Sequence, residues 1–206
     1  MSHRGALSPT TGTTAVLLAA GAGTRLGLGP KALLPFRGRT LVEVLAGALL
    51  EGGCREVVVV LGADAAGVRA GTDLSRHRVL DNPGWDTGMA GSFRLGVAAA
   101  DPADHVLVAL VDQPGLTAET VARLLAAHRP GRVTAAAYRA ADGTLRRGHP
   151  LVLDAGLRAE AAATATGDAG ARFFLQAHPE LIDLVDCSDL SGGGDLDSPG
   201  QLHLLD

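Results

Sequence analysis

The chain has 206 residues, a length that fits one domain with a sizeable core. Hydrophobic residues make up 47% of it, which excludes a disordered protein, and aromatic residues only 3%, so the core must be aliphatic. The 18 basic and 22 acidic side chains give a net charge of −4 without a basic block, which argues against a nucleic-acid partner. No apolar run reaches the length of a membrane span, so we expect no membrane partner either.

The N-terminal residues 1–13 are rich in Ser, Thr, Gly and Pro and are predicted to form a flexible leader. The apolar run 15–20 is too short for a signal peptide and leads into a glycine-rich loop, not a cleavage site. Cys54 and Cys187 lie far apart without metal-ligand spacing, which favours two reduced thiols in a cytoplasmic protein. Residues 14–206 are predicted to form a single domain.

Short apolar segments along the chain predict six strands. Several of them are apolar on both faces, which is typical of a parallel sheet covered by helices. The predicted strands are 15–19, 56–61, 78–80, 106–111, 133–138 and 181–185.

Helical patterns alternate with these strands. Thr40 and Glu43 form a capping box at the start of the first helix. The alternation predicts an α/β fold: a single doubly wound, mostly parallel, Rossmann-like sheet with helices on both faces. Ligands bind beyond the carboxyl ends of the strands in such sheets. The predicted helices are 41–50, 63–70, 92–100, 118–128, 155–163 and 169–177.

The loop 21–31, which follows the first predicted strand, has the composition of a phosphate-binding loop. Gly21 and Gly23 can adopt positive φ and let backbone N–H groups approach phosphate oxygens. Arg25 and Lys31 add positive charge, and Lys31 is the only lysine in the chain. An ammonium is a compact point charge, whereas a guanidinium is a broad planar fork, so the lone lysine suggests a position that arginine cannot fill. The alternative is a glycine-rich turn whose Arg and Lys are solvated.

Two common nucleotide motifs do not fit this loop. A P-loop requires Ser or Thr after its lysine, and Ala32 stands there. A dinucleotide fingerprint requires Gly-x-Gly-x-x-Gly, but the third glycine, Gly27, comes one residue late and Arg25 lies inside the loop.

Asp112 follows the aliphatic segment 106–111 and therefore emerges at the ligand-binding edge of the predicted sheet. Mg²⁺ prefers hard oxygen ligands, few of them from protein and the rest from phosphate and water. Asp112 is therefore a candidate metal ligand. The alternative is an ordinary strand-end residue before Pro114.

The sequence Leu-Ala-Ala-Gly-Ala-Gly-Thr-Arg-Leu-Gly at 18–27, with Pro-Lys-Ala-Leu-Leu-Pro-Phe at 30–36, resembles the signature of nucleotidyltransferases with the nucleotide-diphospho-sugar transferase fold. Within that superfamily the chain is most similar to the branch that contains molybdenum-cofactor cytidylyltransferase. The segments that support this branch are 82–92, 112–114, 148–150, 167–172 and 195–199.

This resemblance implies a function and a set of partners. The expected reaction moves a nucleoside monophosphate, CMP from CTP, to a phosphomonoester acceptor, molybdopterin, and releases pyrophosphate. The expected cofactor is Mg²⁺, and a molybdenum hydroxylase would receive the product. Positioning and charge neutralisation would dominate catalysis, because the attacking phosphate is already ionised.

The resemblance also implies roles for individual residues. Arg25, Lys31 and Asp112 would be catalytic, with Asp112 and Asp197 as metal ligands; Asp195, Asp189 and Asp186 compete for the second ligand position. His149, Asp168 and Arg172 would contact the acceptor, although a lone histidine is usually a polar surface residue. Ser92 has the alternative role of a helix cap. The nucleotide-binding residues would be Leu18, Ala19, Ala20, Gly21, Ala22, Gly23, Arg25, Lys31, Asn82, Gly88 and Ser92.

Three other functions remain open at this point. A guanylyltransferase or sugar-1-phosphate nucleotidyltransferase would keep the chemistry and change the base and acceptor. A non-catalytic carrier of the molybdenum cofactor would need none of the catalytic residues. An NAD-linked oxidoreductase would need the dinucleotide fingerprint and an acidic residue near the end of the second strand, where Leu61 and Gly62 stand and Asp64 is close.

Overall fold

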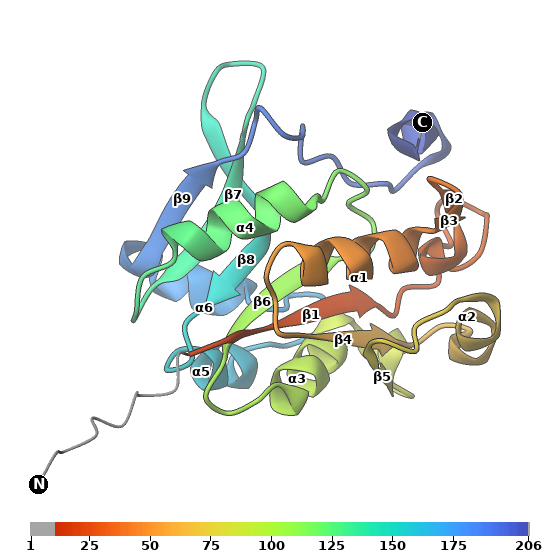
Figure 1. The fold of residues 1–206 in the computed structure, drawn as a ribbon, viewed down its shortest axis with the longest axis horizontal. Helices are drawn as coiled ribbons and strands as arrows, with labels where there is room; N and C mark the ends of the chain where they lie inside the picture. The colour runs from red at the N-terminus through yellow and green to blue at the C-terminus, as the bar shows by residue number, and fades with distance from the viewer. Residues whose placement is uncertain (1–10, 206) are drawn as a thin grey trace, which may run out of the picture.

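The computed structural model describes residues 11–205, which are built around one seven-stranded sheet (Figure 1). Its strand order is β5-β4-β1-β6-β8-β7-β9, and all neighbouring strands are parallel except β8, which runs antiparallel to β6 and β7. A two-stranded hairpin, β2 and β3, lies outside this sheet. The strands are β1 (Thr13–Ala19), β2 (Pro35–Phe36), β3 (Arg39–Thr40), β4 (Glu56–Leu61), β5 (Arg78–Asp81), β6 (His105–Leu110), β7 (Val133–Arg139), β8 (Leu145–Leu153) and β9 (Ile182–Asp186).

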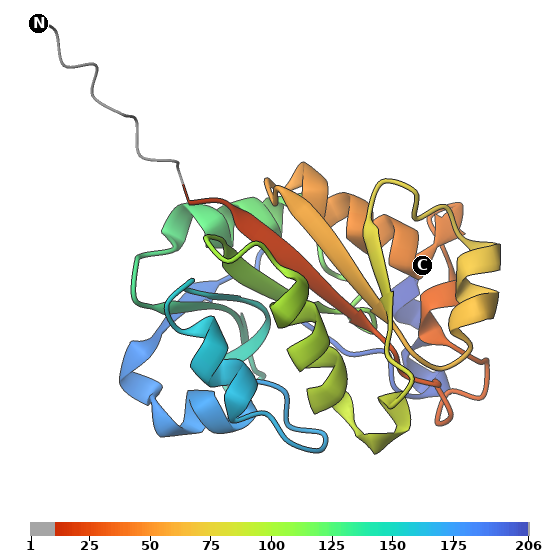
Figure 2. The same cartoon turned by 90° about the horizontal axis from the view of Figure 1, so that it is seen from below.

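Helices cover both faces of the sheet (Figures 1 and 2). Apolar side chains of α1 and α4 pack with one face, and those of α3, α5 and α6 pack with the other. The predicted doubly wound α/β fold is confirmed. The helices are α1 (Leu41–Glu51), α2 (Ala65–Gly71), α3 (Met89–Ala99), α4 (Ala118–Ala127), α5 (Arg158–Ala163) and α6 (Arg172–Ala177).

All six predicted strands and all six predicted helices are present, with ends that differ by up to three residues. The capping box of α1 is confirmed, since the Thr40 N–H donates to Glu43 at 2.8 Å. The predicted leader falls mainly on residues 1–10, which lie outside the described residues, and β1 begins at Thr13. Among residues 11–205, no helix combines the length and apolarity that crossing a bilayer would require.

The strand β8 is absent from the predicted elements. Its first half, with Arg146, Arg147 and Gly148, lacks an apolar pattern, and Pro150 is a residue that normally argues against a central strand. The β7–β8 pairing accommodates these residues through a shift of register between Ala135 and Ala137. Tertiary pairing therefore decides the conformation of this segment against its local sequence signals.

The sheet and α3 approach each other at Gly96, where a Cβ would collide with the Val16 side chain of β1. We expect Gly96→Ala to lower the free energy of unfolding by about 1–3 kcal/mol, because the overpacked helix must move away from the sheet. Gly47 in α1 is the matched control, since nothing lies within 4 Å of its added Cβ. Gly47→Ala should stabilise the protein by about 0.5–1 kcal/mol through helix propensity. Urea unfolding measures both, and a Gly96→Ala variant as stable as the parent would contradict the tight contact.

Candidate functional site

A cavity lies at the carboxyl ends of β1 and β6, where the sheet changes its direction of winding. The chain passes from β1 through α1 to β4 on one side, while β6 pairs with the other side of β1. Such switch points are the usual ligand sites of open α/β sheets. The cavity has a volume of about 390 Å³. Its lining residues are Leu18, Ala20, Gly21, Ala22, Gly23, Thr24, Arg25, Lys31, Trp85, Asp86, Gly88, Met89, Ser92, Leu110, Val111, Asp112, Asp168 and Asp197.

The glycine-rich loop after β1 forms one wall of this cavity. Gly23 has φ +64°, and a Cβ there would collide with the carbonyl oxygen of Gly29, so only glycine fits. The N–H groups of Leu26 and Gly27 both donate to the Gly23 carbonyl, which folds the loop back on itself. Gly21 does not have a positive φ. The loop is therefore a compact turn whose shape depends on Gly23.

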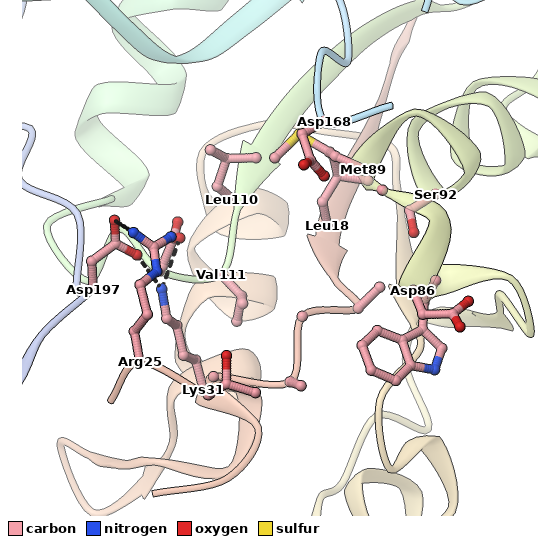
Figure 3. A pocket seen from close by; sticks show the side chains of 18 residues that line it. Leu18, Arg25, Lys31, Asp86, Met89, Ser92, Leu110, Val111, Asp168 and Asp197 are labelled. Carbon is pink, nitrogen blue, oxygen red and sulfur yellow. Dashed lines mark hydrogen bonds and ion pairs between the residues drawn. The ribbon is translucent and has the colours of Figure 1, made fainter. Parts of the chain in front are cut away.

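Lys31 places its ammonium between two carboxylates in the cavity (Figure 3). Its Nζ donates to Asp112 Oδ2 at 3.1 Å and to Asp197 Oδ1 at 2.7 Å. The Lys31 side chain is only 13% exposed, so it does not point into bulk water. Arg25 lies at the rim, 3.8 Å from Asp197 Oδ2 and 79% exposed. The structure thus brings together Arg25, Lys31, Asp112 and Asp197 from distant parts of the sequence.

Backbone contacts explain how the two acids meet. Asp112 lies just past the end of β6, where the Val111 N–H donates to the Leu18 carbonyl of β1. The Leu196 N–H then donates to the Asp112 carbonyl at 2.7 Å and holds the C-terminal segment beside it. Asp195 points elsewhere, because its carboxylate accepts from Gln113 Nε2 at 2.7 Å. Asp197 is consequently the acid that faces Asp112 across Lys31.

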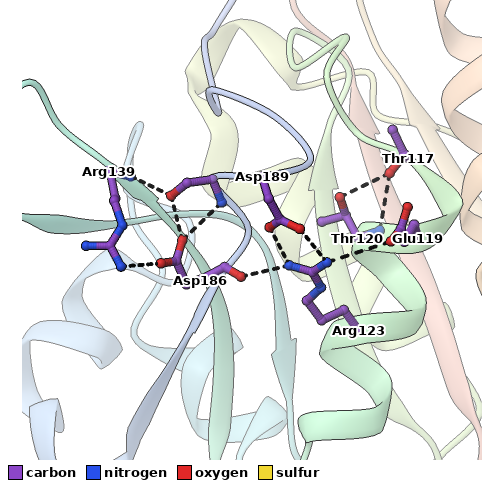
Figure 4. Close-up of polar contacts among 8 residues, drawn as sticks. Thr117, Glu119, Thr120, Arg123, Arg139, Asp186 and Asp189 are labelled. Carbon is purple, nitrogen blue, oxygen red and sulfur yellow. Dashed lines mark hydrogen bonds and ion pairs between the residues drawn. The ribbon is translucent and has the colours of Figure 1, made fainter. Parts of the chain in front are cut away.

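The segment that leads from β9 to Asp197 is held by arginines of α4 and β7 (Figure 4). Arg123 of α4 donates to both oxygens of Asp189, at 2.6 and 2.9 Å, and to the Asp186 carbonyl. Arg139 of β7 donates to the Asp186 carboxylate at 2.7 Å. Asp186 and Asp189 thus have arginine partners, which leaves Asp197 as the metal-ligand candidate of this segment beside Asp112.

The two carboxylates at Lys31 differ in their electrostatics. Burial raises the pKa of Asp112, and the Lys31 ammonium opposes that rise. The hydrogen bond from Lys31 is the largest cause of the lowered pKa of Asp197, and Arg25 contributes to it. A neighbouring positive charge therefore matters more for keeping Asp112 ionised than for keeping Asp197 ionised.

The residues in this cluster fit a divalent metal. Asp112 Oδ1 is buried and has no hydrogen-bond partner among residues 11–205, whereas Oδ2 accepts from Lys31. An orphaned carboxylate oxygen is costly unless a ligand satisfies it. Asp112 and Asp197 together offer the hard oxygen atoms that Mg²⁺ and Mn²⁺ prefer.

The loop 82–92 forms the opposite wall. Asn82 donates to Ser92 Oγ at 2.9 Å and accepts from the Gly84 N–H, so it shapes the loop from behind and does not line the cavity. Ser92 lies inside α3, not at its N-terminal cap, so the capping alternative is wrong. Ala19 is buried in β1 and is the other predicted nucleotide-binding residue that does not line the cavity.

A second cavity of about 490 Å³ adjoins the first, and three residues, Met89, Leu110 and Asp168, line both. His149, Asp168 and Arg172 all line this second cavity. Asp168 reaches the junction because Gly88, with φ +115°, packs directly against the Gly167 backbone, where a side chain would collide. The three residues predicted to contact the acceptor therefore lie together, next to the predicted nucleotide site.

His149 is half-buried in the second cavity, and its carbonyl accepts a hydrogen bond from the Tyr138 hydroxyl at 2.9 Å. Burial is the main cause that lowers the pKa of His149 to about 4, and Arg147 contributes. At neutral pH the imidazole is therefore uncharged and can orient a ligand only through neutral hydrogen bonds.

Arginines supply the positive charge of the second cavity. Arg139 and Arg146 are engaged by Asp186 and Asp142. Within residues 11–205, no hydrogen bond or ion pair engages the Arg147 or Arg172 guanidinium, and both line the cavity. Arg147 has no predicted role, although the Arg146-Arg147 pair before Gly148 is visible in the sequence.

A comparison with protein families matches residues 15–181 to the MobA-like NTP transferase domain. The chain belongs to this family. The match spans the glycine loop and most of the lining of both cavities, and it ends before the C-terminal segment that carries Asp197 and the other candidate second metal ligands.

Solved structures share the fold of this MobA-like chain over nearly its whole length. A nucleotidyl transferase from Methanothermobacter thermautotroptrophicus superimposes with a TM-score of 0.79 at 26% identity and covers 94% of this chain and 95% of its own. Rv0371C from Mycobacterium tuberculosis, solved as a complex with manganese, has a TM-score of 0.78 at 26% identity and covers 95% and 98%. The predicted nucleotide-diphospho-sugar transferase fold is thereby confirmed.

One curated relative of this MobA-like chain carries a name from another enzyme class. Nicotine blue oxidoreductase from Paenarthrobacter nicotinovorans is 58% identical over 194 residues, which is 93% of this chain and 95% of that protein. Family membership alone therefore does not decide which reaction the cavity supports.

Proposed function

We propose that this chain is a divalent-metal-dependent nucleotidyltransferase that moves CMP from CTP to a phosphomonoester of the molybdopterin class. The observation that carries the proposal is the cluster of Lys31, Asp112 and Asp197 beside the glycine loop, with an unpartnered oxygen on Asp112. A metal held by Asp112 and Asp197 would supply positive charge to the triphosphate. The manganese complex of Rv0371C supports divalent metal use.

The chain's own residues would position the donor. Gly21, Ala22 and Gly23 line the cavity, where backbone N–H groups would suit phosphate oxygens. On donor binding, Lys31 would exchange its carboxylate partners for phosphate oxygens, since a metal would then neutralise those carboxylates. Arg25 at the rim would reach the departing pyrophosphate. An acceptor phosphate oxygen would bond to the α-phosphorus as the bond to the β-phosphate bridge breaks.

The second cavity would hold the acceptor. Its free Arg147 and Arg172 suit a phosphate group, and its shared wall with the first cavity suits direct attack on the donor. The neutral imidazole of His149 would orient the acceptor without taking a proton. We further propose that the protein works in the cytoplasm and passes its product to a molybdenum hydroxylase.

Arginine variants test the assignment of the two cavities. We expect Arg147→Ala and Arg172→Ala each to lower kcat/KM for the acceptor by about 10–100-fold, because a charge-assisted hydrogen bond to phosphate is lost. The KM for the nucleoside triphosphate should stay unchanged. Arg76→Ala is the control, since Arg76 is exposed and lines neither cavity. Steady-state kinetics with each substrate varied in turn measure the split, and an equal loss for both substrates would rule out separate cavities.

A second candidate function is reduction of a dye by a nicotinamide dinucleotide, and the 58% identity to nicotine blue oxidoreductase favours it. A dinucleotide pyrophosphate could use the same glycine loop. However, Asp64, the acid nearest the end of β4, accepts from the Gly67 N–H as a helix cap and does not line the described cavity. A ribose-binding acid is thus missing from the position that the dinucleotide fold uses.

Two assays on the same purified protein, pyrophosphate release and oxidation of a nicotinamide dinucleotide, distinguish these functions. Pyrophosphate release is measured with CTP, GTP, ATP and UTP at fixed Mg²⁺, with and without molybdopterin, and with a sugar 1-phosphate as the alternative acceptor. Oxidation of NADH and NADPH is followed in parallel with nicotine blue. Acceptor-dependent pyrophosphate release from CTP supports the proposal, and release from another triphosphate supports a related transferase. Molybdopterin binding without release would indicate a carrier, and dye reduction without release would establish the oxidoreductase.

A further inference from the structure

A cluster of two histidines and an aspartate lies at the other end of the sheet from the cavities. His105 is the first residue of β6, His128 follows α4, and Asp154 follows β8. Asp112 is seven residues beyond His105 along the same strand direction, so the cluster is roughly 20 Å from the candidate nucleotide site at 3.3 Å per residue. The family match and the proposed reaction assign no role to this cluster.

The three side chains converge on one point. One ligand atom from each residue lies within 4.8 Å of the others. Asp154 Oδ2 is 3.4 Å from His105 Nδ1 and 4.0 Å from His128 Nε2. The two imidazole rings meet edge to face at 4.5 Å. The side chains of His105, His128 and Asp154 are only 15%, 6% and 13% exposed, so little solvent satisfies them.

His128 carries the second, independent observation. Its Nε2 is buried and has no hydrogen-bond partner within residues 11–205. The 4.0 Å separation from Asp154 is too long for a hydrogen bond. At the other side of the ring, Nδ1 lies 2.9 Å from Thr134 Oγ1, which fixes the ring with Nε2 toward the carboxylate. An imidazole nitrogen thus faces a carboxylate across a gap that no hydrogen bond closes.

Backbone N–H groups also make hydrogen bonds to the side chains of Asp154 and His105. Asp154 Oδ1 accepts from the Gly156 N–H at 2.8 Å, which directs Oδ2 toward both histidines. His105 Nδ1 accepts from the Ala155 N–H at 3.1 Å, a hydrogen bond that this nitrogen would exchange for the metal on binding. The nearby Asp183 carboxylate is already paired with Arg129 and Arg132. The Thr134 contact of His128 and the Gly156 contact of Asp154 resemble the outer hydrogen bonds that orient metal ligands.

We propose that His105, His128 and Asp154 bind a first-row transition-metal dication of the Zn²⁺ class. Two imidazoles and one carboxylate are a common ligand set for such ions. Ligand atoms about 2.0–2.2 Å from zinc lie about 3.3–3.6 Å apart in a tetrahedron, so the observed spacing closes with small movements. The ion would link the start of β6, the α4–β7 connection and the end of β8. This site is separate from the oxygen ligands at Asp112 that suit Mg²⁺.

Zinc titration of the metal-stripped full-length chain tests this site. We expect the parent to bind one more Zn²⁺ per chain than His128→Gln or Asp154→Asn. At 100-fold excess over Kd, Zn²⁺ should raise the Tm of the parent by roughly 5–10 °C more than that of the variants. His77→Gln is the matched control, because His77 also has a buried unpartnered nitrogen but belongs to no ligand cluster in the described part of the chain. Its zinc response should equal that of the parent.

A structure of the parent soaked with ZnCl2 makes the test independent of variant folding. Anomalous scattering at the zinc edge is expected about 2.1 Å from His128 Nε2. Co²⁺ in place of Zn²⁺ should give ligand-field absorption without the thiolate charge-transfer band that binding at Cys54 or Cys187 would produce. Equal zinc stoichiometry in parent and variants, or an anomalous peak only elsewhere, would overturn the proposal.

Discussion

Lys31→Ala is expected to lower the rate of nucleotide-dependent pyrophosphate release by about 100- to 1,000-fold. The loss corresponds to the roughly 3–4 kcal/mol that one positioned donor supplies to a transition state with developing charge. The Lys31 side chain is nearly buried between the two carboxylates, whereas Arg25, the other cation of the cluster, is 79% exposed at the rim, so we expect Arg25 not to replace it. Initial rates at saturating triphosphate and Mg²⁺ measure the effect.

Two comparison variants sharpen this prediction. Lys31→Arg keeps the charge but puts a broad fork between two carboxylates, so we expect it to restore little of the activity. Arg25→Ala should have a smaller effect than Lys31→Ala, because Arg25 is 79% exposed and makes one contact at 3.8 Å. Circular dichroism checks that each variant is folded. An unchanged rate in folded Lys31→Ala would falsify the phosphate role.

Asp112→Asn is expected to remove metal-dependent activity, with a loss of at least about 1,000-fold. An amide keeps the size of the carboxylate but withdraws the negative charge that would hold a dication, and a catalytic metal supplies several kcal/mol. Lys31 retains Asp197, so the free energy of unfolding should change by no more than about 1 kcal/mol. Rates over a range of Mg²⁺ and Mn²⁺ concentrations, with urea unfolding alongside, measure both quantities.

Asp195→Asn is the matched control for this variant. Asp195 is close in the sequence to Asp197, but its carboxylate binds Gln113 in the second cavity. The Asp195→Asn substitution should therefore leave the dependence of the rate on Mg²⁺ and Mn²⁺ unchanged. A normal metal response in Asp112→Asn, or its loss in Asp195→Asn, would mean that the metal site has been assigned to the wrong acid.

The sheet could be predicted because its parallel strands are continuous aliphatic runs. Val57 to Leu61 in β4 are wholly buried, so apolar character alone identifies the strand. The antiparallel β8 could not be found in this way, since Arg146, Arg147 and Pro150 conceal it. Its conformation comes from pairing with β6 and β7, a non-local cause that no window of sequence contains.

The glycine loop and Asp112 could be predicted as parts of the candidate site because the strands before them are easily recognised. The glycine loop and Asp112 come directly after predicted strands, so topology alone brings them to one edge. The choice of Asp197 over Asp195 depends on the Leu196 N–H donating to Asp112, a contact across 84 positions. The sequence does not reveal the cluster of His105, His128 and Asp154, because its members come from the start of β6, the end of α4 and the end of β8 and have no common spacing.

The nicotine blue oxidoreductase relative bears on how the shared cavity is used. Lys31, Asp112 and Asp197 lie in contact in this chain, and they are the groups that the proposed phosphate transfer would use. Reduction of a dye would not require that metal-binding arrangement. The Asp112→Asn variant therefore separates the two functions as well, because it should abolish transfer and leave any dye reduction intact.

The most direct test is a crystal structure with Mg²⁺ and a non-hydrolysable CTP analogue. The proposal predicts the triphosphate against the loop after β1, the metal on Asp112 and Asp197, and Lys31 Nζ within hydrogen-bond distance of a phosphate oxygen. If the analogue binds elsewhere, or if Lys31 still bridges the two carboxylates while the phosphates lie beyond its reach, the proposed nucleotidyl transfer is wrong.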